Sequence, residues 1–102
     1  MHKLEYLPIA KHDMIDIARY ISQELCNPSA ADKLSEEMIE SAERLKDFPY
    51  ANSVFTPIKP LKYEYRKLLV QNYIMFYWVN ENKKIITVAR VIYMRRDYEK
   101  QL

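Results

Sequence analysis

The sequence predicts an α+β domain in which a two-helix hairpin packs on a mostly antiparallel, twisted sheet, in the order β-α-α-β-β-β. Three features lead to this prediction. A short run of large apolar residues opens the chain, apolar residues then recur at helical spacing, and three strand-like runs fill the last third. A chain of 102 residues suffices for one domain with its own core, so we expect residues 1–102 to form a single domain.

The first strand and the first helix are predicted from the opening of the chain. Residues 3–9 are rich in large apolar groups, which suits a strand that ends at Pro8. From Ala10 onward, apolar residues repeat every three or four positions, which indicates an amphipathic helix. This apolar stripe consists of Ala10, Met14, Ile17, Ala18, Ile21 and Leu25.

A second helix is expected after a break at Asn27 and Pro28. Ser29 suits the N-cap, with Asp32 in the capping-box position, and the helix should run to about Phe48. Two helices joined by so short a break form an antiparallel hairpin.

The other strands follow an irregular, proline-punctuated connection over residues 49–60. They are predicted at residues 63–70, 73–79 and 84–93. Turns at 71–72 and 80–82 should join them as antiparallel hairpins. Because the chain contains no glycine, tight turns should use Asn, Asp or Pro, and Asn72 is expected to supply positive φ.

Strand alternation and the tail complete the predicted fold. In the last strand one face should hold Ile86, Val88, Arg90 and Ile92. Residues 94–102 are expected to form a short C-terminal tail helix with Tyr98 and Leu102 packed inward.

Composition narrows the class of protein. An apolar fraction of 49% argues against disorder, and no run approaches the ~18 apolar residues of a membrane span. The N-terminus lacks the apolar core of a signal peptide, so we expect a soluble cytoplasmic protein. The single cysteine, Cys26, has no partner for an internal disulfide, which favours a small buried hydrophobe or an idle thiol.

Charge is distributed unevenly along the chain. Residues 1–58 carry six basic and ten acidic residues, a net charge of −4, whereas residues 59–102 carry ten and four, a net charge of +6. The asymmetry fits either a polyanionic partner facing the basic half or a dipolar surface without function.

Basic residues near the end of the chain are the first candidates for a site. Arg95 and Arg96 follow the last strand, where two guanidinium groups can hold phosphate oxygens. Tyr98 can stack on a base or bond a phosphate. The structural alternative is that Arg96 pairs with Asp97 or Glu99 on the surface while Tyr98 anchors the tail.

A second group of basic residues lies on the predicted strands. Lys62, Arg66 and Lys67 surround the strand at 63–70 and could follow a phosphate backbone, or could simply make that edge soluble. Arg90 interrupts an apolar run and therefore needs a partner, such as Glu64 or a helix carboxylate, unless it opens into a site.

Several chemistries have no signal in the sequence. We find no glycine-rich phosphate loop, no clustered metal ligands and no nucleophile triad, and neither histidine lies in the basic half. We therefore expect no metal and no cofactor. Aromatic residues of the strands, such as Tyr73 and Trp78, favour packing over a stacking platform.

Four segments resemble the RelE/ParE superfamily of bacterial toxins from type II toxin–antitoxin, or plasmid stabilisation, modules. They are Tyr65-Arg66-Lys67-Leu68-Leu69-Val70, Asn72-Tyr73-Ile74-Met75-Phe76-Tyr77, Arg90-Val91-Ile92-Tyr93 and Arg95-Arg96-Asp97-Tyr98. The family's element order is also β-α-α-β-β-β, so the resemblance spans nearly the whole chain.

The resemblance implies a toxin that arrests growth, and we expect ribosome-dependent mRNA cleavage, with poisoning of DNA gyrase as the alternative. RelE-like members enter the ribosomal A site and cut mRNA without a metal, whereas ParE-like members poison DNA gyrase without known nuclease chemistry. In both groups the C-terminal segment of a cognate antitoxin wraps the toxin. The partners implied are this antitoxin and either ribosome-bound mRNA or gyrase, with no membrane, in a homodimer or a toxin–antitoxin hetero-oligomer.

The resemblance also assigns expected roles to residues. Under mRNA cleavage the catalytic residues would be Lys67, Arg95 and Tyr98. Nucleic acid or another target would be bound by Arg66, Arg90, Arg96 and Lys62. Three positions depart from the nuclease pattern, since Ile74 stands where an arginine is common, Tyr65 where a lysine is common, and Met94 near a frequent histidine. A third alternative is a small sheet protein that only pairs with a partner.

Overall fold

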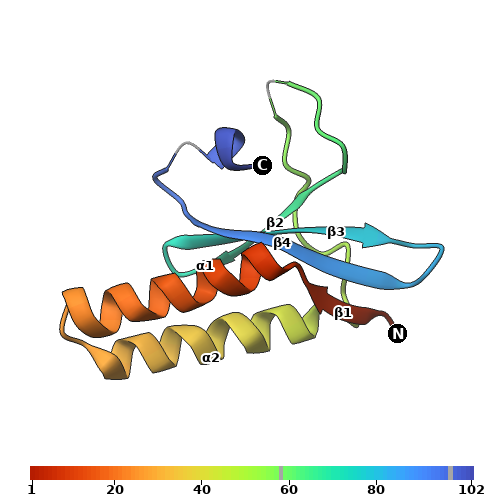
Figure 1. Cartoon of the computed structure of the whole chain (residues 1–102). Helices are drawn as coiled ribbons and strands as arrows, with labels where there is room; N and C mark the ends of the chain where they lie inside the picture. Colours follow the sequence, from red (N-terminus) through yellow and green to blue (C-terminus); the bar gives the residue numbers. More distant parts are fainter. Residues whose placement is uncertain (58, 97) are drawn as a thin grey trace.

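In a computed structural model of the chain, two helices lie side by side against one face of a four-stranded sheet (Figure 1). The structure describes residues 1–57, 59–96 and 98–102, without the side chains of residues 98 and 99. The elements in chain order are β1 (Lys3–Tyr6), α1 (Pro8–Arg19), the π-helical turn η1 (Tyr20–Glu24), α2 (Pro28–Arg44), β2 (Arg66–Val70), β3 (Tyr73–Asn80), β4 (Ile85–Tyr93) and the 3-10 turn η2 (Tyr98–Gln101). This order confirms the predicted α+β class. Within the described residues, no helix is both long and apolar enough to cross a membrane.

The strands are ordered β1-β4-β3-β2, so the first and last strands of the chain are neighbours. β1 runs parallel to β4, whereas β4, β3 and β2 pair antiparallel, as predicted for most of the sheet. Parallel neighbours cannot be joined by a tight turn, and here the helical hairpin and two strands separate β1 from β4 along the chain.

The helix boundaries differ from those expected. We predicted Pro8 at the end of the strand, but α1 begins at this residue. Proline suits the first helical turn, because a backbone N–H there would have no partner within the helix. The N-cap of α2 is Asn27 rather than Ser29, since the Asn27 side chain accepts a hydrogen bond of 3.1 Å from the Ala30 N–H. α2 ends at Arg44, before the expected Phe48.

Positive φ angles occur at residues other than asparagine. Cys26, Gln71 and Lys84 have φ values of 51°, 53° and 56°, so the expectation for Asn72 is wrong. At Gln71 the side chain donates a 2.8 Å hydrogen bond to Glu37 of α2, a tertiary contact that ties the β2–β3 turn to the helix. Cys26 is exposed, so the buried reading of this thiol does not hold.

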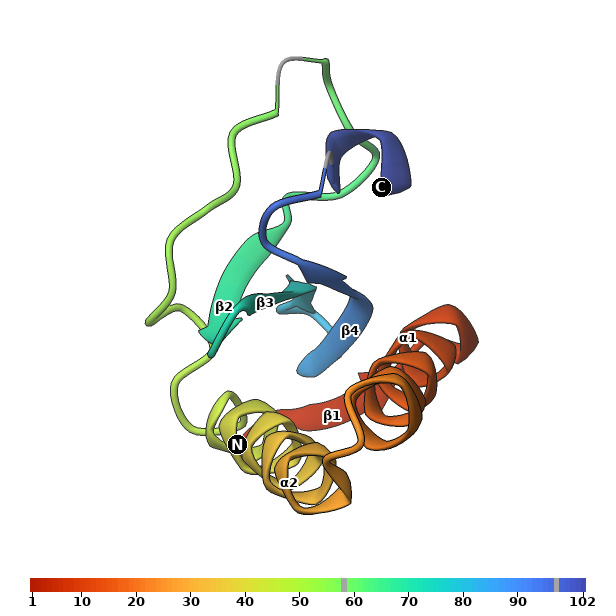
Figure 2. The ribbon, with the colours of Figure 1, turned by 90° about the vertical axis from the view of Figure 1, so that its left-hand side faces the viewer.

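Two apolar clusters lie on opposite faces of the sheet. Under the helices, the buried residues include Leu34, Met38, Tyr77, Ile86 and Val88. On the outer face, the buried residues are Phe55, Tyr65, Ile74, Phe76, Ala89 and Ile92. The later part of the connector between α2 and β2, with Phe55 and Leu61, and the C-terminal tail lie on this outer side (Figures 1 and 2). Within the described part of the tail, the structure does not show the predicted helix. In its place, Tyr98–Gln101 form a four-residue 3-10 turn.

An irregularity in β4 breaks the predicted alternation of its faces. Phe76 lies opposite Arg90, while the next residue, Tyr77, lies opposite Val88, so Ala89 is an extra residue. As a result Val91 joins the helix-side cluster and Ile92 the outer cluster, which corrects the single face expected for Ile86 to Ile92.

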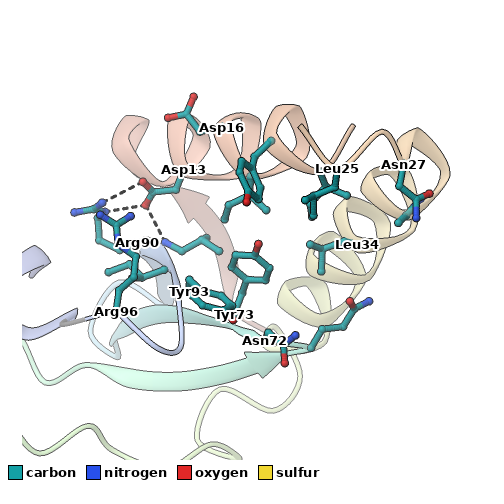
Figure 3. Close-up of a pocket in the computed structure, with 17 residues that line it drawn as sticks. Asp13, Asp16, Leu25, Asn27, Leu34, Asn72, Tyr73, Arg90, Tyr93 and Arg96 are labelled. Carbon is teal, nitrogen blue, oxygen red and sulfur yellow. Dashed lines mark hydrogen bonds and ion pairs between the residues drawn. The ribbon is translucent and has the colours of Figure 1, made fainter. Parts of the chain in front are cut away.

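The Asp13 carboxylate extends the sheet edge beyond β1. β1 pairs with β4 only as far as Val88, and past this point Asp13 Oδ2 accepts a 2.9 Å hydrogen bond from the Val91 N–H. The same carboxylate binds Arg90 through Nε at 2.8 Å and Nη2 at 3.1 Å (Figure 3). Arg90 Nη1 donates to the Gln101 carbonyl at 2.9 Å. Of the partners expected for Arg90, the helix carboxylate is therefore confirmed.

The carboxylate of Glu81 links the β3–β4 turn to the connector and to the N-terminus. Glu81 accepts hydrogen bonds from the Tyr50 hydroxyl of the connector and from the Lys84 amine, and lies 3.1 Å from His2 Nε2 near the N-terminus. These contacts, with Lys84 first, lower the pKa of Glu81 from 4.5 to about 2. The hydrogen bond to Glu81 is in turn the main cause that raises the pKa of Tyr50.

Replacing Asp13 by Asn should destabilise the fold by about 2–3 kcal/mol, because both charges are largely buried and Arg90 would lose its counter-charge. Urea unfolding would measure the change. Asp16→Asn on the same helix is the matched control, because its contact with Arg19 is exposed and 3.9 Å long, and should cost less than about 0.5 kcal/mol. Equal effects of the two substitutions would contradict a special role for Asp13.

The Glu81 carboxyl should titrate in the folded protein with a midpoint of about 2. Since this pKa lies below the unfolded value, the carboxylate's contribution to stability is present above about pH 4.5 and is lost as pH falls toward 2. NMR titration of the side-chain carboxyl carbon would measure the midpoint. Lys84→Ala should raise it and the neighbouring Lys83→Ala should not; a midpoint near 4.5 in the unaltered chain would refute the cluster.

Candidate functional site

A groove of about 810 Å³ opens between the helical hairpin and the end of the sheet. Asp13 and Arg90 lie at one end of it, Leu25 and Asn27 at the other, and Tyr73 stands on the sheet side between them (Figure 3). Residues of α1, η1 and α2 line it on one side and residues of β3, β4 and the β2–β3 turn on the other, and the end of the hairpin where α1 turns into α2 extends past the sheet (Figure 1).

The groove walls are apolar and aromatic. From the helices the apolar lining consists of Ile17, Tyr20, Ile21, Leu25, Ala30 and Leu34. Tyr20 and Leu25 remain 53% and 56% exposed, which leaves apolar surface uncovered in a concave site. On the sheet side, the ring centres of Tyr73 and Tyr93 lie 5.6 Å apart. The pKa of Tyr73 is raised, chiefly by desolvation and further by electrostatic interaction with Tyr93 and Tyr20.

Charge is concentrated at the end of the groove where β4 leaves the sheet. Arg90 is neutralised by Asp13, but Arg96 also lines the groove and is exposed. The Arg96 N–H donates a 3.0 Å hydrogen bond to the Tyr93 carbonyl, which fixes the turn that carries Arg95 and Arg96. The groove thus combines an apolar wall with a charged end, where the carboxylates of Asp13 and Asp16 and the guanidinium groups of Arg90 and Arg96 line it.

Two of the predicted basic residues lie elsewhere. Arg66 points to the helix side of β2, where Nη1 donates to the Asn52 carbonyl at 2.7 Å and the guanidinium lies 4.9 Å from the centre of the Tyr50 ring. Lys62 lies on the connector, with its amine 5.3 Å from the centre of the Tyr63 ring. Neither residue lines the groove.

Lys67 lies on the outer face of the sheet, opposite to Arg66, as the alternation of β2 predicted. It pairs with Phe76, which in turn lies opposite Arg90, so Lys67 and Arg90 share one cross-strand row. Their backbones are two strand spacings apart, about 10 Å. The side chain of Tyr98 and the expected pair between Arg96 and Asp97 or Glu99 lie outside the described residues.

The structure therefore brings together only part of the predicted set. Arg90, Arg95 and Arg96 lie at or just past the end of β4, and Lys67 lies on the outer face of the sheet. Arg66 is bonded to the connector, and Lys62 is part of the connector. The roles of all these residues remain predictions. Within the described ranges, no three His, Cys, Asp or Glu side chains come together as metal ligands.

Sequence reasoning missed the groove residues Asp13, Tyr73 and Tyr93. The apolar stripe did contain a signal, because Ile21 packs against the core whereas the stripe continues to Leu25, which stays exposed at the groove. Read in this way, the surplus apolar surface points to a partner rather than to the core.

Comparison with known proteins identifies the family. Residues 4–98 match the family model described as ParE toxin of type II toxin–antitoxin system, parDE. No curated protein sequence matches the chain significantly.

Solved structures of low sequence identity share the fold. A chromosomal ParDE system from P. aeruginosa is similar with a TM-score of 0.73 and 18% identity, covering 93% of this chain and 98% of that chain. The RelBE2 toxin–antitoxin complex from Mycobacterium tuberculosis has a TM-score of 0.65 and 12% identity, covering 90% and 96%. The archaeal RelE–RelB complex from Pyrococcus horikoshii has a TM-score of 0.60 and 11% identity, covering 93% and 97%. Because the family model extends over nearly the whole chain, this protein belongs to the ParE toxin family of type II toxin–antitoxin systems.

Proposed function

We propose that this toxin arrests growth by binding DNA gyrase, as the ParE-like resemblance implies, rather than by cutting RNA. The observation that carries the proposal is the engagement of its sheet arginines within the fold. Arg90 is held by Asp13 and the tail, and Arg66 by Asn52 and Tyr50. Guanidinium groups committed in this way shape a surface instead of moving with a reacting phosphate.

RNA cleavage requires a group that takes the 2′-OH proton, a charge on the phosphate and a group that protonates the leaving oxygen. The middle-strand position where nucleases often keep an arginine is Ile74, which is buried in the outer cluster. Lys67, Arg95 and Arg96 can then supply positive charge, which suits binding to a large target by electrostatic complementarity.

Ribosome-dependent mRNA cleavage is the second candidate. It is favoured by one specific arrangement: Lys67 and the C-terminal tail lie on the same outer face of the sheet (Figures 1 and 2). A lysine there could assist proton transfer if Arg95 and Tyr98 closed over the same phosphate.

The groove is the proposed docking surface for the cognate antitoxin. The M. tuberculosis and P. horikoshii relatives are described as complexes with an antitoxin. In this chain, apolar antitoxin side chains would cover Tyr20, Leu25 and Tyr73, and a carboxylate would meet Arg96. Because Arg90 and Arg96 line the same groove, its occupant would also cover this part of the proposed target-binding set.

Lys67→Arg separates the two candidate mechanisms, because arginine keeps the positive charge but cannot release a proton at physiological pH. We expect the variant to arrest growth as the unaltered toxin does, with gyrase–DNA cleavage complexes in induced cells and intact mRNA. Mapping of mRNA 5′ ends beside an assay of trapped gyrase would measure both outcomes. Cuts within A-site codons that disappear in Lys67→Arg would establish the nuclease instead.

Leu25→Glu tests the groove as the antitoxin site. A carboxylate on the apolar wall should weaken the purified toxin–antitoxin complex by about 10-fold or more and abolish rescue by the co-expressed antitoxin, while toxicity persists. Ile39→Glu on α2 is the matched control, since Ile39 is similarly exposed, at 49%, and does not line the groove. Unchanged neutralisation of Leu25→Glu would exclude the groove.

A further inference from the structure

A stacked pair of aromatic rings lies far from the groove, at the opposite end of β3. The rings of Tyr63 and Trp78 are nearly parallel, with 3.9 Å between their centres and 5° between their planes. Tyr65 meets both rings edge-on, at 6.3 Å from Tyr63 and 5.8 Å from Trp78, and so fixes their orientation. Tyr63 remains 38% exposed, so the outer ring of this stack meets solvent.

The geometry of the pair is that of two stacked nucleobases. Planar rings held at this separation form a surface on which a further flat ring can stack once the Lys62 amine, which lies over the Tyr63 ring, moves to the side. Tyr63 precedes β2 and Trp78 lies within β3, so the surface rests on the sheet rather than on a mobile loop alone.

A hollow of about 300 Å³ adjoins the stack. It is lined by Tyr63, Trp78, Val79, Asn80, Glu81 and Asn82. Asn80 Oδ1 already accepts a 3.1 Å hydrogen bond from the Lys83 N–H, so its NH₂ group can still donate to the edge of a base, while the Asn82 amide carries both a donor and an acceptor. The charge of Glu81 is balanced by Lys84 and by its contacts with Tyr50 and His2, so it does not oppose a nearby phosphate unshielded.

Positive charge accompanies the rings. The Lys62 amine lies 5.3 Å from the centre of the Tyr63 ring, and Lys59 and Lys83 are exposed nearby in the chain. Aromatic rings interleaved with lysines are the combination by which proteins hold single strands, through stacking of bases and attraction of phosphates.

We propose that Tyr63 and Trp78 form a stacking site for an unpaired base of single-stranded nucleic acid, with Lys62 binding the adjacent phosphate. The site is separate from the groove and does not depend on whether gyrase or the ribosome is the target. A purely structural role would be to fasten the connector to the sheet, and the test must separate the two.

Trp78 provides the measurement, because it is the chain's only tryptophan and its emission reports on this site alone. Purified toxin would be titrated with short single-stranded RNA and DNA of the same sequence, with the hybridised duplex, and with inorganic polyphosphate. We expect a single strand of either kind to quench Trp78, and the duplex and polyphosphate to quench it far less. Preference for RNA or for DNA would identify the source of the ligand.

Tyr63→Ala should weaken single-strand binding about 10-fold, the order expected for the loss of one stacked base, while Tyr63→Phe should retain it. Lys62→Ala should reduce the slope of log K against log[salt] by about one, the change expected for the loss of one phosphate contact. Phe48→Ala is the control, since Phe48 is an exposed aromatic residue, at 65%, outside the stack.

Thermal unfolding of each variant shows whether the fold persists. If Tyr63→Ala does not fold, the two single variants Tyr63→Phe and Lys62→Ala still test the proposal. Absence of quenching by both single strands, or equal affinities of Tyr63→Ala and the unaltered chain, overturns the proposal. The measurement uses no cells, so its failure would leave growth arrest and gyrase binding untouched.

Discussion

The ion pair between Asp13 and Arg90 joins three parts of the molecule that no single element spans. β1 is too short to pair with all of β4, and the Asp13 carboxylate takes over as partner of the strand edge at Val91. Arg90 then carries this contact on to the tail through the Gln101 carbonyl. A largely buried pair is costly to desolvate, and here additional backbone donors and acceptors offset that cost. The Asp13 carboxylate thus ties α1 to the end of β4 at one end of the groove, in addition to the core packing of Ala10, Met14 and Ile17.

Local patterns in the sequence were sufficient for the elements but not for their details. The helical stripes and the alternation of β2 were predictable because neighbouring residues determine which face is apolar. The extra residue at Ala89 was not, because a bulge depends on the register between two strands and leaves no mark on composition. Gln71 similarly adopts positive φ while its side chain binds Glu37, a contact made only after the helix has docked.

For the site, the sequence showed which residues are basic but not which of them are already engaged. Arg66 and Lys67 are neighbours, and alternation alone placed them on opposite faces. The partners of Arg66 and Arg90, however, come from the connector and from a helix 77 positions away in the chain. The stripe that ends at the exposed Leu25 hinted at uncovered apolar surface, but the volume of the groove was unpredictable, since it is the space left between elements whose separation emerges only on packing. The Tyr63–Trp78 stack joins the connector to β3 and needed the same tertiary knowledge.

The two proposed surfaces differ in what a groove-bound antitoxin would do to them. Arg96 lines the groove, so the occupant proposed for it would cover this part of the proposed target-binding surface. Tyr63 and Trp78 line a separate hollow beside the β3–β4 turn, which shares no residue with the groove. An antitoxin confined to the groove would therefore silence the toxin's target surface and leave the stacking site open. Binding of single strands by the neutralised complex follows from this separation, and it would make nucleic-acid binding and toxicity two independent properties of one small sheet.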